Sequence, residues 1–172
     1  YGAGDFVDGE TATLPGLKGA LSQHNGTWNL EWGRLPINDR KLVIIDEGTG
    51  LDVEDISHLS NIRSSGECIV QKVITDRTRA RTRLIWIANC RKANTGIKDY
   101  AHGVETVKDF FGKPEDVRRV DVAMTCASGE VSIEKINQTQ APSINKYTKD
   151  ACHNLILFAW SLQSSSIIIN RE

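Results

Sequence analysis

Two carboxylates and an amide follow two apolar runs of the chain. Asp46 and Glu47 come directly after Leu42-Val43-Ile44-Ile45, and Asn89 comes directly after Leu84-Ile85-Trp86-Ile87-Ala88. Nucleotide hydrolysis needs one carboxylate to hold a hydrated Mg²⁺ and a second to orient and polarise the attacking water. Asp46 and Glu47 fit these two roles in that order. Asn89 could donate to a phosphate oxygen and accept from the water.

The two apolar runs predict parallel strands that are buried on both faces. The first run has four consecutive apolar residues, three of them β-branched, which is typical of such strands, and the second is apolar on both faces like the first. The carboxyl ends of parallel neighbours meet at one edge of the sheet, where α/β proteins bind ligands. About 40 residues separate the two runs, which leaves room for a crossover connection. The alternative is a core strand that ends in two solvated acids, and an asparagine that only forms a turn.

Two arginines stand immediately before a third apolar run. Arg118 and Arg119 precede Val120-Asp121-Val122-Ala123-Met124-Thr125, which predicts a third buried strand. Cationic side chains that enter a buried strand are costly unless they face a partner. An anion is therefore an economical partner for this pair.

A β-hairpin is predicted over residues 67–83, with its tip at residues 72–76. Its second half alternates arginine with small residues, which is the period of a strand. The alternation would place four guanidinium groups on one side, those of Arg77, Arg79, Arg81 and Arg83. A solvated strand face with local ion pairs is the alternative interpretation.

The composition predicts one main domain without membrane contact. The chain has 172 residues, 40% of them hydrophobic, and a formal net charge of −1. This length can bury a core, and the charge means that any contact with nucleic acid must be local. No run of about 18 apolar residues and no signal-peptide pattern occurs, so we expect a soluble intracellular protein. The ends at Tyr1 and Glu172 indicate a segment of a larger protein.

The cysteines and histidines do not predict a metal site. The four cysteines are far apart, with no CxxC pair, and the four histidines are equally scattered. We expect the cysteines to be reduced.

Turn and cap signals place the remaining elements. We expect a loop over residues 1–13, a short helix around residues 15–21 and a turn over residues 34–41. Asn25-Gly26 predicts a hairpin whose following strand carries Trp28, Leu30 and Trp32 on one face, packed on the core. Asp52 is the predicted N-cap of a helix that Ser64-Ser65-Gly66 ends.

The second half of the chain alternates polar connections with helices. Residues 90–100 and 129–145 are predicted as polar connections, and residues 120–125 as the strand described above. Helices are predicted over residues 102–111, for one turn at 115–118, and from the cap Thr148 to about residue 163.

These motifs, in this order, resemble the AAA+ module of the minichromosome maintenance (MCM) family of replicative helicases over most of residues 10–126. Residues 12–17 and 32–35 are similar to the helix-2 insert region, and residues 42–47 look like the Walker B strand. Residues 67–83 are similar to the pre-sensor-1 hairpin and the strand that ends at Asn89 to sensor 1. Arg118-Arg119-Val120-Asp121 stands where the family has Ser-Arg-Phe-Asp, and residue 148 would begin the helical lid.

The resemblance implies an AAA+-type parallel sheet flanked by helices, with a partial core over residues 1–145 and the start of a C-terminal lid over residues 146–172. It implies a ring-forming, ATP-dependent DNA helicase, hexameric as in the family and located in the cytoplasm, nucleoid or nucleus. ATP and Mg²⁺ would bind at subunit boundaries, with Asp46 on the metal, Glu47 as the base and Asn89 positioning the water. Arg119 would act as the arginine finger. Lys72, Arg77 and Arg79 on the hairpin would grip DNA phosphates without reading sequence.

The chain departs from the family in three places. Arg118 and Val120 replace the family's Ser and Phe, so either arginine can be the finger, and Gly48-Thr49-Gly50 follows the acids where an apolar residue is usual. No GxxxxGK[ST] motif occurs, so we expect the 172-residue piece to show no ATP turnover without its parent protein. Two alternatives stay open: an AAA+ ATPase that remodels protein, and a degenerate AAA+-like binding module that does not hydrolyse ATP.

Overall fold

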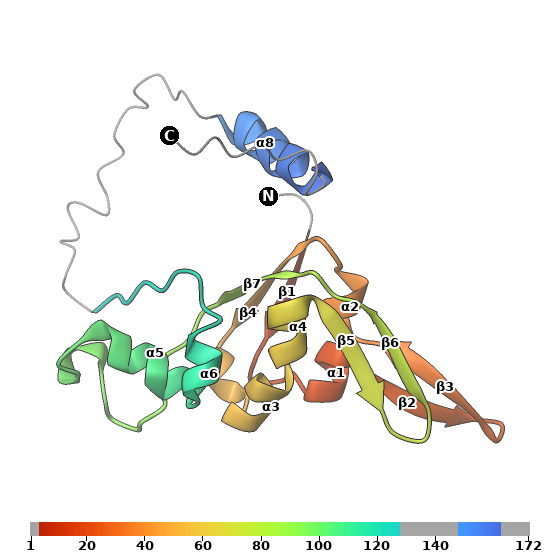
Figure 1. Ribbon diagram of the computed structural model, residues 1–172. Coiled ribbons are helices and arrows are strands. Elements are labelled where there is room, and N and C mark those ends of the chain that lie inside the picture. The colour runs from red at the N-terminus through yellow and green to blue at the C-terminus, as the bar shows by residue number, and fades with distance from the viewer. Residues whose placement is uncertain (1–3, 128–147, 163–172) are drawn as a thin grey trace. The chain divides into compact units, whose positions relative to one another are not determined.

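The computed structural model describes residues 4–127 and 148–162, which belong to two separate compact units. The larger unit has a parallel sheet of three strands in the order β1-β4-β7 (Figure 1). The strands are β1 (Gly4–Asp8), β4 (Leu42–Asp46) and β7 (Arg83–Trp86). The predicted α/β class and the parallel pairing of the two apolar runs are therefore confirmed. The loop expected over residues 1–13 is wrong in part, because residues 4–8 form an edge strand beside β4.

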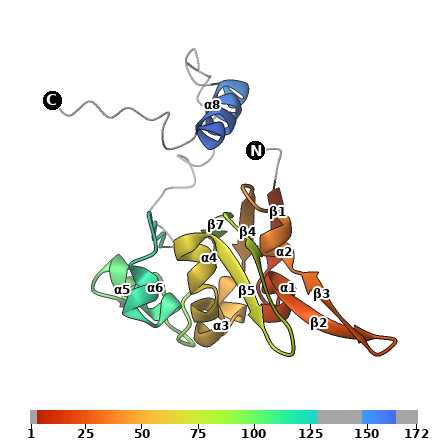
Figure 2. The same ribbon diagram turned by 45° about the vertical axis from the view of Figure 1, so that its right-hand side comes forward.

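One face of the sheet is covered and holds the core. Val43 and Ile45 of β4 are fully buried against Leu35, Ile56 and Leu59. The short helices α1 (Leu14–Lys18), α2 (Arg34–Ile37), α3 (Val53–His58) and α4 (Ser60–Ser65) supply most of this cover on the same side of the sheet (Figures 1 and 2). The continuous helix predicted after Asp52 is broken at Leu59, where α3 ends and α4 begins. The helix α4 ends at Gly66, as predicted, and Gly66 has a left-handed conformation.

The other face of the sheet is partly exposed, which corrects the expectation of strands buried on both faces. Phe6, Ile44 and Ile85 are register partners across the three strands. Phe6 is 60% exposed and Ile85 is 46% exposed, whereas Ile44 is half-buried. The apolar run of β4 thus reflects one fully buried face and one face with a row of accessible apolar side chains.

Two β-hairpins extend from the same side of the unit (Figures 1 and 2). Strands β2 (Gly19–His24) and β3 (Thr27–Trp32) form the first, with the turn at Asn25-Gly26, and β5 (Glu67–Gln71) and β6 (Thr75–Arg79) form the second. Both predicted hairpins are confirmed. Trp32 packs against the core as predicted, whereas Trp28 is exposed near the turn.

The predicted helices after β7 are present, but the predicted strand is not. The helices are α5 (Gly103–Phe111) and α6 (Pro114–Val117). Residues 120–125 form no strand, because no described strand lies beside them to complete a ladder. Val120 packs against the core, whereas Val122 and Met124 are exposed. Thr125 instead lies against Gly103 at the start of α5.

Residues 148–162 form the second described unit. Its helix α8 (Lys149–Ser161) begins at Thr148, whose hydroxyl accepts a hydrogen bond from the Ala151 N–H, as the cap signal predicts. The connection expected at residues 129–145 lies outside the described residues. In the described parts of the chain, no helix has the length and apolar character needed to cross a bilayer.

A candidate hydrolytic site at the carboxyl edge of the sheet

The structure brings Glu47 and Asn89 into direct contact at the carboxyl ends of β4 and β7. The Asn89 Nδ2 donates to Glu47 Oε2 at 3.2 Å. The contact follows from the parallel register of the two strands, in which Ile45 pairs with Trp86. The proximity predicted from the two apolar runs is therefore observed, and both side chains are solvent-accessible at this edge.

Asp46 lies beside this pair with one carboxylate oxygen committed to the backbone. Its Oδ1 accepts a hydrogen bond from the Glu47 N–H at 2.9 Å. Among the described residues, none donates to its Oδ2. That oxygen is suited to bind a hydrated cation, because Mg²⁺ in phosphate sites takes one or two carboxylates and keeps water and phosphate as its other ligands. Within the described residues, no group of three or more His, Cys, Asp or Glu side chains is arranged to hold a metal.

Glu47 has a backbone conformation that side chains with a β-carbon rarely adopt. Its φ is 47° and its ψ is 43°, in the left-handed region. Such a conformation costs about 1–2 kcal/mol in a residue other than glycine. The turn that follows, Gly48–Gly50, is fixed by a hydrogen bond from the Gly48 N–H to the Ile87 carbonyl at 2.9 Å. The strain therefore turns the chain sharply at the edge and leaves the Glu47 carboxylate facing β7.

Two residues at this edge were not predicted as site residues from the sequence. Asp8 pairs in register with Asp46, so the end of β1 brings a third carboxylate to the same edge. Its Oδ1 accepts from the Glu10 N–H at 2.9 Å. The signal for it was weak, because the five-residue strand that carries it begins with Gly and Asp, which disfavour strands. Arg91 is the second such residue, and its side chain binds three backbone carbonyls beside the site.

The two candidate finger arginines differ in their surroundings. Arg119 donates to the Glu115 carbonyl at 2.7 Å and lies 3.6 Å from Asp116 Oδ1. Asp116 is buried and also pairs with Arg63 at 3.0 Å, so Arg119 belongs to a three-member ionic cluster. Arg118 is exposed and forms no ion pair within residues 4–127. Neither arginine contacts the Glu47–Asn89 pair.

The hairpin cations are only partly arranged as predicted. Arg77 and Arg79 lie on one face of β6, but Arg81 leaves the hairpin and forms a two-pronged pair with Asp39, at 2.6 Å for Nη2 to Oδ2. Arg83 is the first residue of β7. The expected face of four guanidinium groups is therefore wrong, because the strand ends at Arg79. Arg79 in turn lies 3.3 Å from Glu67.

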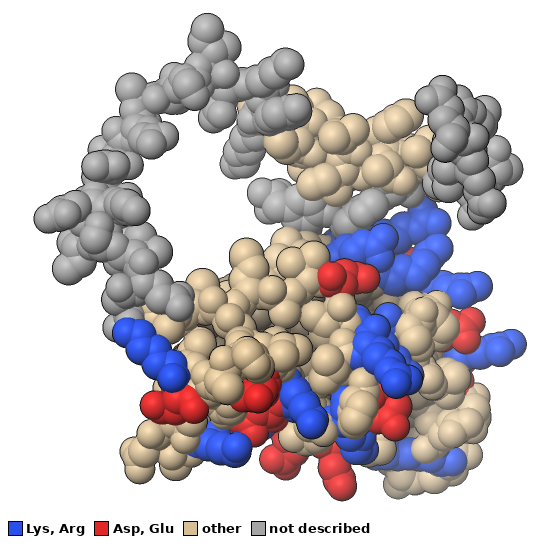
Figure 3. Space-filling view, turned by 60° about the vertical axis from the view of Figure 1, so that its left-hand side comes forward, with Lys and Arg blue, Asp and Glu red and all other residues tan. Residues whose placement is uncertain are grey.

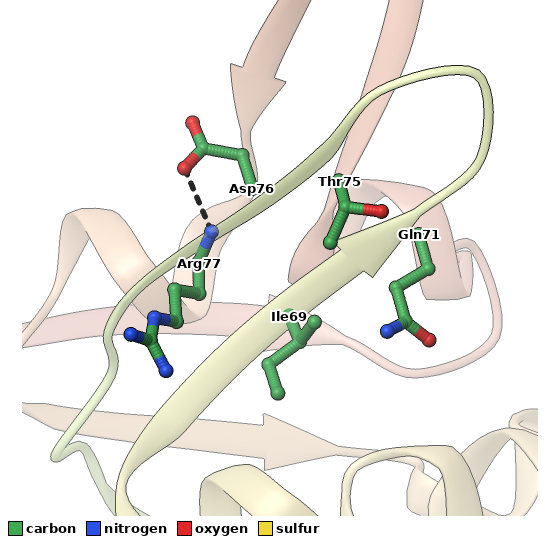
Figure 4. Close-up of a pocket in the computed structure, with 5 residues that line it drawn as sticks. All are labelled: Ile69, Gln71, Thr75, Asp76 and Arg77. Atoms are coloured by element: carbon green, nitrogen blue, oxygen red, sulfur yellow. Dashed lines mark hydrogen bonds between the residues drawn. The ribbon is translucent and has the colours of Figure 1, made fainter.

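Lys72 and Arg77 are the hairpin cations without an ion pair among the described residues. The hairpin carries a shallow hollow of about 380 Å³ lined by Ile69, Gln71, Thr75, Asp76 and Arg77. Figure 4 shows the Arg77 side chain pointing to the opposite side from that of Asp76, whose carboxylate accepts the Arg77 N–H at 2.8 Å. Elsewhere, cationic and acidic side chains are interspersed over much of the face in Figure 3.

The comparisons leave the family of the chain open. No protein-family model matches the sequence, and no curated protein matches it.

The four cysteines are free, as predicted, and burial raises the pKa of the Cys68 thiol, which makes that thiol less reactive.

Proposed function

We propose that the chain is part of an MCM-like AAA+ ATPase that binds Mg-ATP at the Asp46–Glu47–Asn89 edge and moves DNA. The observation that carries the proposal is the contact between Glu47 and Asn89 beside Asp46, at the edge of a parallel sheet where nucleotides bind. The strained backbone of Glu47 supports it, since such conformations cluster at functional sites.

Each side chain has a distinct role in the proposed reaction. Asp46 would hold Mg²⁺ through Oδ2, because Oδ1 is committed to the backbone. Glu47 would accept a proton from the attacking water, and Asn89 would hold that water in line with the phosphate through its amide. The ion would supply neutralisation of phosphate charge. Arg118 or Arg119 would act on ATP held by a neighbouring subunit of a ring. Arg118 is favoured, because it is exposed and forms no ion pair with another described residue, whereas Arg119 pairs with Asp116.

The proposed DNA contacts are on the hairpins. Lys72 and Arg77 have no acidic partner in the described part of the chain, which leaves their charges available for phosphates, whereas Arg79 shares its charge with Glu67. A protein-remodelling ATPase with the same edge is the second candidate, favoured by the mixture of cationic and acidic side chains on the face drawn in Figure 3. Loss of DNA affinity on removal of the hairpin cations distinguishes the two.

Replacement of Glu47 by Gln tests the proposed chemistry in a full-length protein that carries a phosphate-binding loop. The amide keeps the size of the side chain but cannot accept the proton, so we expect ATP turnover to fall by about 10²-fold or more while ATP binding persists. Glu54→Gln on α3 is the matched control and should leave turnover unchanged. Unchanged hydrolysis in Glu47→Gln would refute the assigned role.

A further inference from the structure

Arg91 uses its whole guanidinium group to bind backbone carbonyls around the candidate site. Its Nε donates to the Phe110 carbonyl at 2.8 Å, its Nη1 to that of Thr49 at 3.1 Å and its Nη2 to that of Leu51 at 2.8 Å. The guanidinium carbon also lies 5.1 Å from the centre of the Phe110 ring. No carboxylate within residues 4–127 forms a salt bridge with Arg91, although the charges of Asp109 and Asp52 act on it from nearby, so its direct hydrogen-bond partners are the three carbonyls.

These three carbonyls come from two segments that are far apart in the sequence. Thr49 and Leu51 belong to the turn that follows Glu47, and Phe110 lies in the last turn of α5. The last four carbonyls of a helix lack partners within it, and a cation at that end is favourable. Arg91 itself comes two residues after Asn89. One side chain therefore joins the segment that carries Asn89, the turn that carries Glu47 and the end of α5.

The turn held by Arg91 is the one that imposes strain on Glu47. Gly50 donates its N–H to the Glu47 carbonyl at 2.9 Å, and Leu51 donates to the Gly48 carbonyl at 3.2 Å. These bonds close a single turn, and a strained conformation persists only where its surroundings over-determine it. The Arg91 hydrogen bonds to the Thr49 and Leu51 carbonyls provide that additional constraint. A planar fork with several fixed donors suits this role better than the flexible ammonium of lysine.

We propose that Arg91 is a positioning residue that sets the geometry between the Glu47 carboxylate and the Asn89 amide. It anchors the two loops that carry these groups to each other and to α5. The effect of Arg91 on ATP hydrolysis rests on the proposed function, whereas its role in placing the Glu47 carboxylate against the Asn89 amide does not. Arg91 touches neither the nucleotide nor the water in this proposal and acts through the backbone alone.

The geometric role can be tested on the 172-residue chain by NMR. The side-chain amide signals of Asn89 should shift when Glu47→Gln removes the carboxylate at constant pH, because Nδ2 donates to that carboxylate. We expect the shift caused by Glu47→Gln to fall by about half or more when Arg91 is replaced by Lys or Gln, because a hydrogen bond weakens steeply once its distance and angle leave their range. Arg91→Lys keeps the charge and is the milder variant should Arg91→Gln fail to fold.

Arg63→Lys is the matched control. Arg63 is a buried arginine that lies over an aromatic ring, at 4.6 Å from Phe111, and pairs with Asp116 away from the edge. Its replacement should lower the free energy of unfolding and leave the Asn89 shift unchanged. An Asn89 shift of wild-type size in Arg91→Lys, or an equal loss in Arg63→Lys, would overturn the proposal.

A second readout separates this proposal from the proposed function. In a full-length protein that hydrolyses ATP, Arg91→Lys should lower kcat by about 10²-fold without changing the KM for ATP, because only the reacting groups are misplaced. A raised KM with unchanged kcat would contradict positioning. If the full-length protein does not hydrolyse ATP, the proposed function fails, and the NMR comparison still decides the role of Arg91.

Discussion

Glu47 is the residue on which the account depends most, because its side chain and its backbone both point to a specialised role. Its carboxylate accepts from Asn89, and its backbone is left-handed although it is not a glycine. A left-handed conformation would normally be expected at a glycine, such as the adjacent Gly48, because glycine adopts it without steric cost. The backbone strain therefore lies at the same residue that carries the carboxylate of the candidate site.

Replacing Glu47 by glycine should therefore stabilise the chain. Glycine adopts the left-handed region without steric cost, so we expect the free energy of unfolding to rise by about 1 kcal/mol in urea denaturation. Glu47→Ala is the control, since it removes the carboxylate but keeps the β-carbon and its strain. Equal stability of the Gly and Ala variants would show that the backbone at residue 47 is not strained.

Asp39 gives the chain a pH-dependent contribution to stability. The Arg81 side chain donates to its carboxylate and holds the pKa of Asp39 below its ordinary value. A lowered folded pKa means that the contribution is fully present above the ordinary pKa of about 4 and is lost as the pH falls through the folded pKa. We expect Asp39→Asn to be less stable than wild type at neutral pH, and the gap to close in strong acid. A gap that is the same in strong acid as at pH 7 would contradict this.

At the scale of elements, the β5–β6 hairpin is the candidate contact with DNA. The alternation of arginine and small residues correctly predicted a strand, but not where it ends, because the pairing of Arg81 with Asp39 is a tertiary contact with no local signal. The hairpin keeps Lys72 near its tip and Arg77 on β6, both without acidic partners among the described residues.

The double variant Lys72→Ala/Arg77→Ala should weaken DNA binding of the chain equally for unrelated sequences. Each phosphate contact that is lost should reduce the slope of log affinity against log salt by about 1. Lys98→Ala/Lys108→Ala removes the same charge away from the hairpin, on the loop before α5 and on α5 itself, and should have little effect. An unchanged slope in the hairpin variant would exclude the hairpin as the contact and favour a protein substrate.

At the scale of the whole molecule, the sequence predicted what depends on local pattern. The runs before Asp46 and Asn89 could be predicted as parallel neighbours, because two apolar strands joined by a long connection usually pair through a crossover in one sheet. The strand over residues 120–125 was not formed, because a strand needs a neighbour and the described sheet stops at β7 on that side. Arg91 could not be identified beforehand, because its partners are backbone carbonyls that only the fold brings together.

The central claim is that Glu47 and Asn89 act on one water molecule as a single unit. A double-mutant cycle of ATP hydrolysis in the full-length protein, with Glu47→Gln, Asn89→Ala and both together, tests it most directly. Groups that act as a unit give non-additive losses, so we expect the double variant to be about as slow as Glu47→Gln by itself. Losses that multiply independently, or turnover that survives in all three variants, would contradict the claim.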